Sequence, residues 1–265
     1  MKKSLFGIIL IAFATTLCFA EPKPFNGKSA AETVKDMKTG WNLGNTFDAP
    51  SETAWSQPKT SKAMFDALSA SGIKTIRIPV SWSGHMNKTT YKIDDAWMNR
   101  VKEVVDWAIE DDLYVIINSH HDCWENPTEM TRPGYYPNNV NYEKSSKFLT
   151  EVWGQVSEVF KDYDEHLIFE TMNEPRQCGT NYEWWTDQNN ATCKEAMGTL
   201  NKLNQVSLDT IRKSGGNNQK RYVMIPGLRA AADSVLSSNF MLPTDDEKGK
   251  LIISVHMYDP HDFAM

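Results

Sequence analysis

Side chains that can exchange protons or bind anions lie at the ends of short apolar runs in this sequence. Glu174 closes the run LIFETMNE. A carboxyl group at such a place is partly removed from water, so it is expected to keep its proton to a higher pH than an exposed glutamate. Arg77 alternates with Ile76 and Ile78, which turns its guanidinium away from them and demands an anionic partner. These features favour acid–base chemistry in a cleft.

Further polar side chains occupy equivalent places after other apolar runs; they are Asn42, Asn45, His120, His121, Asp122, Asn173, His256 and Tyr258. Because imidazole and carboxylate groups also bind metal ions, a metal-dependent hydrolase that uses His120, His121 and His256 is an alternative. Adjacent residues of a strand point to opposite faces, which disfavours a shared ion for His120 and His121 unless a turn intervenes. We therefore predict no metal and no cofactor.

Short β-branched apolar runs alternate with longer amphipathic segments along the chain. Strands are predicted over residues 40–45, 75–80, 114–119, 167–174, 221–227 and 251–258, and helices over 61–71, 94–110, 141–160, 193–213 and 231–236. This alternation indicates an α/β fold with a parallel sheet. The first strand lacks the G-x-G-x-x-G turn of a nucleotide-binding sheet, whereas polar groups follow most strands, as in a (β/α)₈ TIM barrel.

The strand count falls short of a complete barrel. The predicted strands start about 42 residues apart, so eight units would extend about a hundred residues past Met265. We therefore expect an incomplete TIM barrel here, with about six of eight βα units and a catalytic domain over residues 21–265 that is truncated after strand six.

The first 20 residues have a basic start, an apolar run from Leu5 to Leu17 and a small residue, Ala20, at the end. This pattern is typical of a secretory signal peptide cleaved after Ala20, and the run is too short to span a bilayer. We expect a secreted monomer with no membrane anchor after cleavage. The net charge of −6 argues against nucleic acid as a partner.

The cysteines that follow the signal peptide suggest one disulfide. Cys178 and Cys193 flank a polar, Trp-rich loop and are the candidate pair in an oxidising compartment, which leaves Cys123 without a partner.

Five motifs resemble, in the same order, those of glycoside hydrolase family 5, most closely the bacterial endoglucanases of its subfamily 4; they are GWNLGNTFDA, TIRIPVSW, VIINSHHD, FETMNEPR and SVHMYDP. Members are (β/α)₈ barrels that cleave β-1,4-linked glucans with retention, through two glutamates. The resemblance implies a secreted endo-β-1,4-glucanase whose partner is a β-1,4-linked polysaccharide. The preferred glycan stays open among cellulose, lichenan, xyloglucan, xylan and mannan.

The resemblance also implies roles for single residues. Glu174 matches the acid/base, Asn173 the residue that binds the sugar 2-hydroxyl, and Arg77 the partner of the nucleophile; an ion pair of Arg77 with Glu170 is the alternative. His256 and Tyr258 complete the catalytic set, and the substrate-binding candidates are Asn42, Asn45, Trp55, His120, His121 and Trp124.

The nucleophilic glutamate has no counterpart up to Met265, so it would follow that residue. By itself the chain would then be inactive and at most a weak glucan binder.

Overall fold

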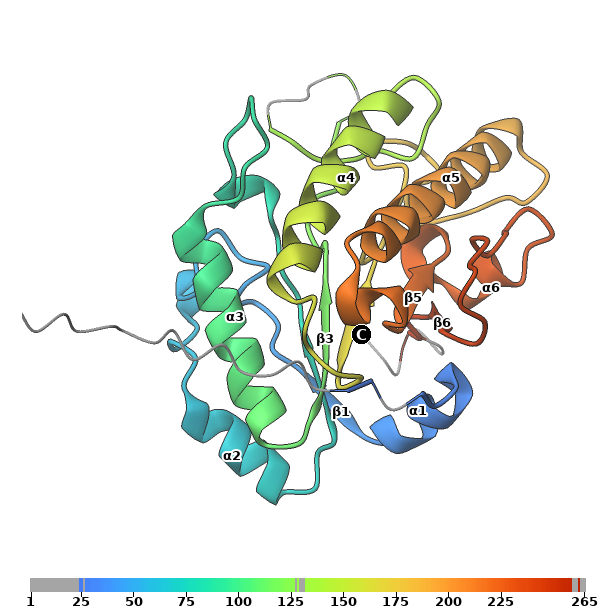
Figure 1. Cartoon of the computed structure of the whole chain (residues 1–265). Helices are drawn as coiled ribbons and strands as arrows, with labels where there is room; N and C mark the ends of the chain where they lie inside the picture. Colours follow the sequence, from blue (N-terminus) through green and yellow to red (C-terminus); the bar gives the residue numbers. More distant parts are fainter. Residues whose placement is uncertain (1–23, 26, 127, 129–131, 259–261, 263–265) are drawn as a thin grey trace, which may run out of the picture.

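The computed structural model of this protein describes residues 24–25, 27–126, 128, 132–258 and 262, and the predicted signal peptide lies outside them. A parallel sheet of six strands forms its centre, with the strands in chain order (Figure 1). The strands are β1 (Gly40–Asn42), β2 (Thr75–Ile78), β3 (Tyr114–Asn118), β4 (Leu167–Glu170), β5 (Val223–Pro226) and β6 (Leu251–Ser254). This order is the one that successive βα units of a TIM barrel produce, so the α/β prediction is confirmed.

Helix α1 (Ala30–Met37) precedes β1. The helices that connect successive strands are α2 (Lys62–Ala70), α3 (Asp95–Glu110), α4 (Tyr142–Val159), α5 (Ala191–Lys213) and α6 (Ala232–Val235). Figure 1 shows α2, α3, α4 and α5 following one another around the sheet. Helix α2 contacts α3, and α4 contacts α5.

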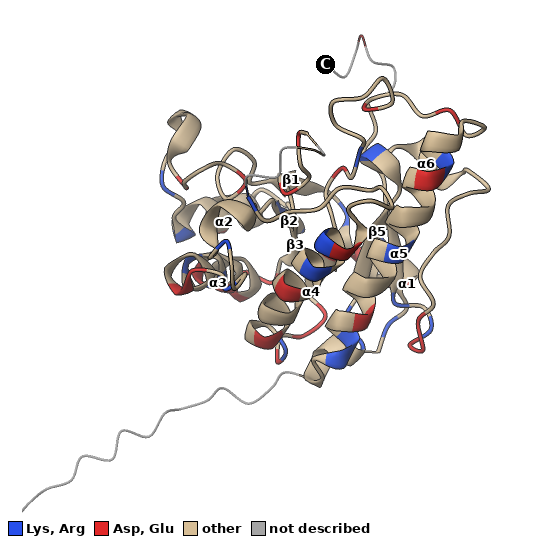
Figure 2. Ribbon diagram, turned by 90° about the horizontal axis from the view of Figure 1, so that it is seen from above, with Lys and Arg blue, Asp and Glu red and all other residues tan. Residues whose placement is uncertain are grey.

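Lys and Arg are interspersed with Asp and Glu along α3, α4 and α5 (Figure 2). Within the described residues, no helix is long and apolar enough to cross a membrane.

The strands separate two apolar cores. Ile78, Ile117 and Phe169 belong to the larger core with the covering helices. On the other face, Ile116 pairs in register with Ile168 in a smaller core that includes Ala30 of α1. This second face corresponds to the interior of a barrel, with α1 packed at its amino end.

Helix α1 was not predicted, because its eight residues carry only a short apolar pattern. A capping box explains where it begins. The Glu32 backbone N–H donates to the Ser29 hydroxyl, and the Ser29 backbone N–H donates to the Glu32 carboxylate.

The predicted strands are several residues too long at their carboxyl ends. β1 ends at Asn42, β4 at Glu170 and β6 at Ser254. The residues that follow lie in loops above the sheet, Glu174 and His256 among them. Some of these residues still donate backbone hydrogen bonds to the neighbouring segment, as Asn173 does to Ser119 and His256 to Ala230. The polar groups that the sequence places at strand ends are therefore grouped at one edge of the sheet.

Candidate active site

A cleft of about 570 Å³ opens where the loops after β1, β2, β3 and β4 meet; its lining includes Asp48, Trp55, Ser81, His120, His121 and Arg176. Each of these loops follows the carboxyl end of a parallel strand, which is where barrel enzymes place their active sites.

A buried ion pair of Arg77 and Glu170 lies beside His120, to which Asn118 connects it; neither partner lines the cleft. The Nε and Nη2 groups of Arg77 donate to Oε2 of Glu170 at 2.9 and 2.5 Å, and Glu170 is fully buried. Asn118 also donates to Oε2, at 2.8 Å, and the Ser254 hydroxyl donates to Oε1 at 2.5 Å. Burial raises the pKa of Glu170, but Arg77 and the hydrogen bonds outweigh it and lower this pKa to about 2. Glu170 is thus a permanent anion.

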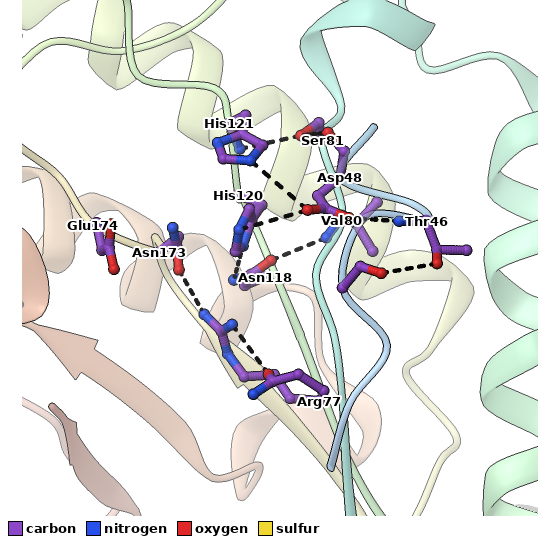
Figure 3. A network of polar contacts seen from close by, with 12 residues as sticks. Thr46, Asp48, Arg77, Val80, Ser81, Asn118, His120, His121, Asn173 and Glu174 are labelled. Carbon is purple, nitrogen blue, oxygen red and sulfur yellow. Dashed lines mark hydrogen bonds and ion pairs between the residues drawn. The ribbon is translucent and has the colours of Figure 1, made fainter. Parts of the chain in front are cut away.

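The ion pair of Arg77 with Glu170 that the sequence offers as an alternative is present, and it does not exclude a further contact of Arg77 with the nucleophile. The guanidinium also reaches outward, because its Nη2 donates to Asn173 Oδ1 at 2.7 Å (Figure 3) and its Nη1 donates to Asn42 Oδ1 at 3.4 Å. Arg77 therefore orients two of the three asparagines that the sequence proposes for the site, Asn42 and Asn173.

Glu174 is held by a histidine. Nδ1 of His256 lies 2.7 Å from Glu174 Oε1, and its Nε2 lies 3.9 Å from Oε1 of Glu170. Arg176 Nη1 is 4.0 Å from the other oxygen of Glu174. Burial raises the pKa of Glu174, but His256 and Arg176 outweigh it, so this pKa lies below its ordinary value. The direction expected for the pKa of Glu174 is therefore wrong for this chain, because the strand pattern does not show that His256 lies beside its carboxylate.

Glu170 and Glu174 in turn shift the pKa of His256. Burial lowers the pKa of His256, yet Glu170 and Glu174 raise it to about 9. A pKa higher in the folded protein than in the unfolded chain stabilises the fold below pH 6.5, and this stabilisation is lost as pH rises from 6.5 through 9. We expect the free energy of unfolding to fall by about 2–3 kcal/mol over this window relative to a His256→Gln variant. Urea unfolding of both proteins at pH 6 and pH 9.5 measures this change in free energy. An equal change in the two proteins would contradict the raised pKa of His256.

His120 is locked in one neutral tautomer. Asn118 accepts from the Val80 backbone N–H through Oδ1, which turns its Nδ2 toward His120 Nδ1 at 3.1 Å. Nδ1 is therefore an acceptor, and the proton lies on Nε2, toward the cleft and Asp48 (Figure 3). Burial, with Arg77 nearby, lowers the pKa of His120 to about 2. His120 thus presents a fixed N–H donor.

His120 and His121 face the same carboxylate, in contrast to the expectation for adjacent strand residues. Strand β3 ends at Asn118, so both lie in the turn that follows, and their Nε2 atoms are 4.0 and 3.7 Å from Asp48 Oδ2. Asp48 lies in the loop after β1 and is buried.

The three side chains could each offer one metal ligand atom, and these atoms lie within 4.8 Å of one another. Two features make this a poor metal site. Asn118 keeps the proton on the His120 nitrogen that would have to bind the ion, and His256 binds Glu174 instead of joining the cluster. The arrangement suits hydrogen bonding to hydroxyl groups better than metal binding.

The two tryptophans predicted to bind substrate have different environments. Trp55 is 53% exposed, lines the cleft and contacts His121 edge-on at 6.4 Å between ring centroids. Trp124 is buried, and its indole N–H donates to the Arg132 carbonyl, so this ring presents no exposed face to a sugar in the described structure. Asn45 and Tyr258 are exposed on the loops after β1 and β6.

The predicted cysteine pairing is also wrong. All three described cysteines are free thiols, and Cys178 faces Cys123, with 3.9 Å between sulfur atoms, rather than Cys193. Proximity along the chain misled the prediction, because neighbouring parallel strands bring the loops after β3 and β4 together.

Sequence reasoning missed the role of Asn118, whereas it named Glu170 as an alternative partner of Arg77. The sequence carries a further signal for Glu170, since it is the one charged residue within the apolar run LIFE. Its position predicts either burial with a partner or a break in the strand.

Comparison with known proteins decides the family. The sequence profile of cellulase (glycosyl hydrolase family 5) matches residues 31–265. The chain belongs to glycoside hydrolase family 5. The predicted resemblance is thereby confirmed, and the TIM-barrel fold class with it.

Relatives within the family are endoglucanases. The chain is 41% identical over 287 residues to endoglucanase A of Clostridium longisporum, covering 100% of this chain and 52% of that protein. It is 43% identical over 239 residues to cellulase/esterase CelE of Acetivibrio thermocellus, covering 89% of this chain and 27% of that one. The chain thus spans about half the length of most curated relatives it matches, and less of CelE.

Solved structures of the same family superpose on the chain. A family 5 lichenase from Caldicellulosiruptor sp. F32, in complex with cellotetraose, matches with a TM-score of 0.83 and 44% identity, covering 92% of this chain and 67% of that one. A subfamily 4 broad-specificity endoglucanase from Clostridium acetobutylicum matches with a TM-score of 0.80 and 42% identity, covering 90% and 68%.

Proposed function

We propose that this family 5 chain carries the acid/base side of the active site of a secreted, retaining endo-β-1,4-glucanase. The observation that carries the proposal is Glu174, whose carboxylate lies at the carboxyl edge of the sheet, on His256 and close to the Arg77–Asn173 pair. Hydrolysis with retention needs one carboxylic acid to protonate the leaving oxygen and a second carboxylate about 5–5.5 Å away to attack the anomeric carbon. Glu174 is the acid in this scheme.

The second carboxylate is not Glu170. Glu170 is fully buried, and both its oxygens already accept hydrogen bonds from Arg77, Asn118 and Ser254. We propose that the nucleophile is a glutamate in residues that follow Met265. A second anion near Glu174 would also oppose the effect of His256 and raise the pKa of Glu174, which a proton donor requires.

Hydrogen-bonding groups and one aromatic ring supply substrate recognition in this proposal. The amide oxygen of Asn173 accepts from Arg77, which leaves the Asn173 NH₂ group to donate to the sugar 2-hydroxyl. The Nε2–H of His120 and the carboxylate of Asp48 face the cleft as donor and acceptor for hydroxyl groups, and Trp55 offers an exposed ring for a sugar face. These groups fit an uncharged β-glucan chain, in agreement with the cellotetraose bound by the lichenase relative.

The proposal is tested by comparing the 265-residue chain with an extended chain that continues into the downstream coding sequence. We expect the extended chain to release reducing sugar from carboxymethyl-cellulose and lichenan and to produce the β-anomer first, as seen by NMR. The 265-residue chain is expected to release none and to bind glucan weakly. Hydrolysis by the 265-residue chain that is lost on Glu174→Gln substitution would contradict the placement of the nucleophile. An extended chain without activity would contradict the function.

A further inference from the structure

Two thiols face each other in the wall of the cleft. Cys123 lies in the loop after β3, and Cys178 lies 55 residues later in the loop after β4. Their sulfur atoms are 3.9 Å apart, and both residues are buried, with 8% and 3% of their surface exposed. Cys193 lies elsewhere, in the first turn of α5.

Hydrogen bonds from one segment fix both cysteines. Cys123 forms an isolated parallel bridge with Tyr135, and the hydroxyl of the next residue, Tyr136, donates to the Cys178 carbonyl at 2.9 Å. The Cys123 thiol donates to the carbonyl of Arg176, in the Cys178 loop, at 3.3 Å. The two backbones are therefore held at a set separation, and the gap between the sulfurs needs to close to about 2.05 Å for a covalent bond. Closing this gap requires rotation of the two side chains and a small shift of one loop.

We propose that Cys123 and Cys178 form a disulfide when the protein meets a disulfide oxidant, joining the loop that carries His120 and His121 to the loop that carries Glu174. This covalent tie lies beyond the hydrolytic function and does not depend on it.

Oxidised glutathione is a sufficient oxidant. The Cys178 thiolate attacks one sulfur of the glutathione disulfide, forming a mixed disulfide and releasing one glutathione. The Cys123 sulfur then attacks Cys178 Sγ and releases the second glutathione. One protein S–S bond forms, one glutathione S–S bond breaks, and the two thiol protons pass to the two glutathione molecules. Cys178 is the better first nucleophile because contact with Cys123, aided by Arg176, lowers the pKa of Cys178, whereas the pKa of Cys123 is raised.

The disulfide would restrain the loop after β4, which carries Arg176 and Glu174. Arg176, two residues before Cys178, lies 4.3 Å over the Trp184 ring and 4.0 Å from Glu174. Linking its loop to the β3 loop restricts the unfolded chain, so the oxidised protein should be more stable to heat.

The test uses the full 265-residue chain incubated with oxidised glutathione, denatured, blocked with N-ethylmaleimide and digested without reduction. We expect mass spectrometry to find a cross-linked peptide pair that contains Cys123 and Cys178, with Cys193 carrying the maleimide. Maleimide or glutathione on both Cys123 and Cys178, or a link from Cys178 to Cys193, would overturn the proposal. This mapping needs no variant and no activity, so its outcome is separate from that of the hydrolysis assays.

Matched variants assign the thermal effect. Oxidation should raise the thermal midpoint by about 5–10 °C in the wild-type chain and in Cys193→Ser. In Cys178→Ser the same treatment should leave the midpoint unchanged and leave Cys123 open to the maleimide. An equal rise in Cys178→Ser would show that the cross-link is not its source.

Discussion

Replacing Glu174 by Gln in the extended chain is expected to lower the rate of cellulose-derivative hydrolysis by roughly 10²- to 10⁴-fold. The amide keeps the shape of the side chain and can still face His256, which lies 2.7 Å from Glu174, but it has no acidic proton for the leaving oxygen. The phenolate group of an aryl glycoside departs without being protonated. Cleavage of the glycosidic bond in these substrates should therefore slow much less. Steady-state rates on carboxymethyl-cellulose and on a nitrophenyl cellobioside measure the two effects.

An equal loss on both substrate classes would contradict the acid/base role and indicate a nucleophilic or positional one. Glu183→Gln serves as the control, because Glu183 binds the Arg176 guanidinium at 3.3 Å on the same loop but is not placed on the reacting groups. Its rates on the two substrates should change by similar, small factors.

Replacing Arg77 by Met is expected to cause the largest loss of stability, about 3–5 kcal/mol. The substitution leaves Glu170 as a fully buried anion without its guanidinium partner, and it also removes the hydrogen bond that orients Asn173. Urea unfolding at pH 7 measures the change in free energy. Combining Arg77→Met with Glu170→Leu should recover much of the loss, because no uncompensated charge remains.

An exposed ion pair provides the comparison for this experiment. Lys92 Nζ lies 3.0 Å from Asp95 Oδ2, and both side chains are more than half exposed, at 64% and 77%. Solvent screens such a pair, so Lys92→Met should change the unfolding free energy by about 1 kcal/mol or less. A loss in Arg77→Met no greater than in Lys92→Met would show that Glu170 is not the buried charge that the structure indicates.

Local patterns determined the order of the elements and the positions of the polar residues along the chain. The β-branched runs specify six strands, and Asn173, Glu174 and His256 follow two of them closely in sequence. Such features depend on residue spacing within a single segment, which the sequence displays directly. The family motifs lie on the same segments. The resemblance to the family therefore assigned catalytic and substrate-binding roles to these polar residues.

Contacts between distant segments were decided only by the tertiary structure. Arg77 and Glu170 are 93 residues apart, and their pairing depends on the register of β2, β3 and β4. The pKa of Glu174 depends on His256, 82 residues away, so an argument from its own strand predicted the wrong direction.

The misassigned side chains have the same physical origin. Trp124 was assigned to the substrate site because it lies in a loop after a strand, yet the packing of loops from different strands buries it. Cys178 was paired with the nearer cysteine along the chain, whereas adjacent parallel strands place it against Cys123. By itself, the sequence determined which residues reach the carboxyl edge of the sheet. Which of them touch, and which carry charge, was decided by the folded arrangement, because burial and Coulomb interactions depend on distance in space.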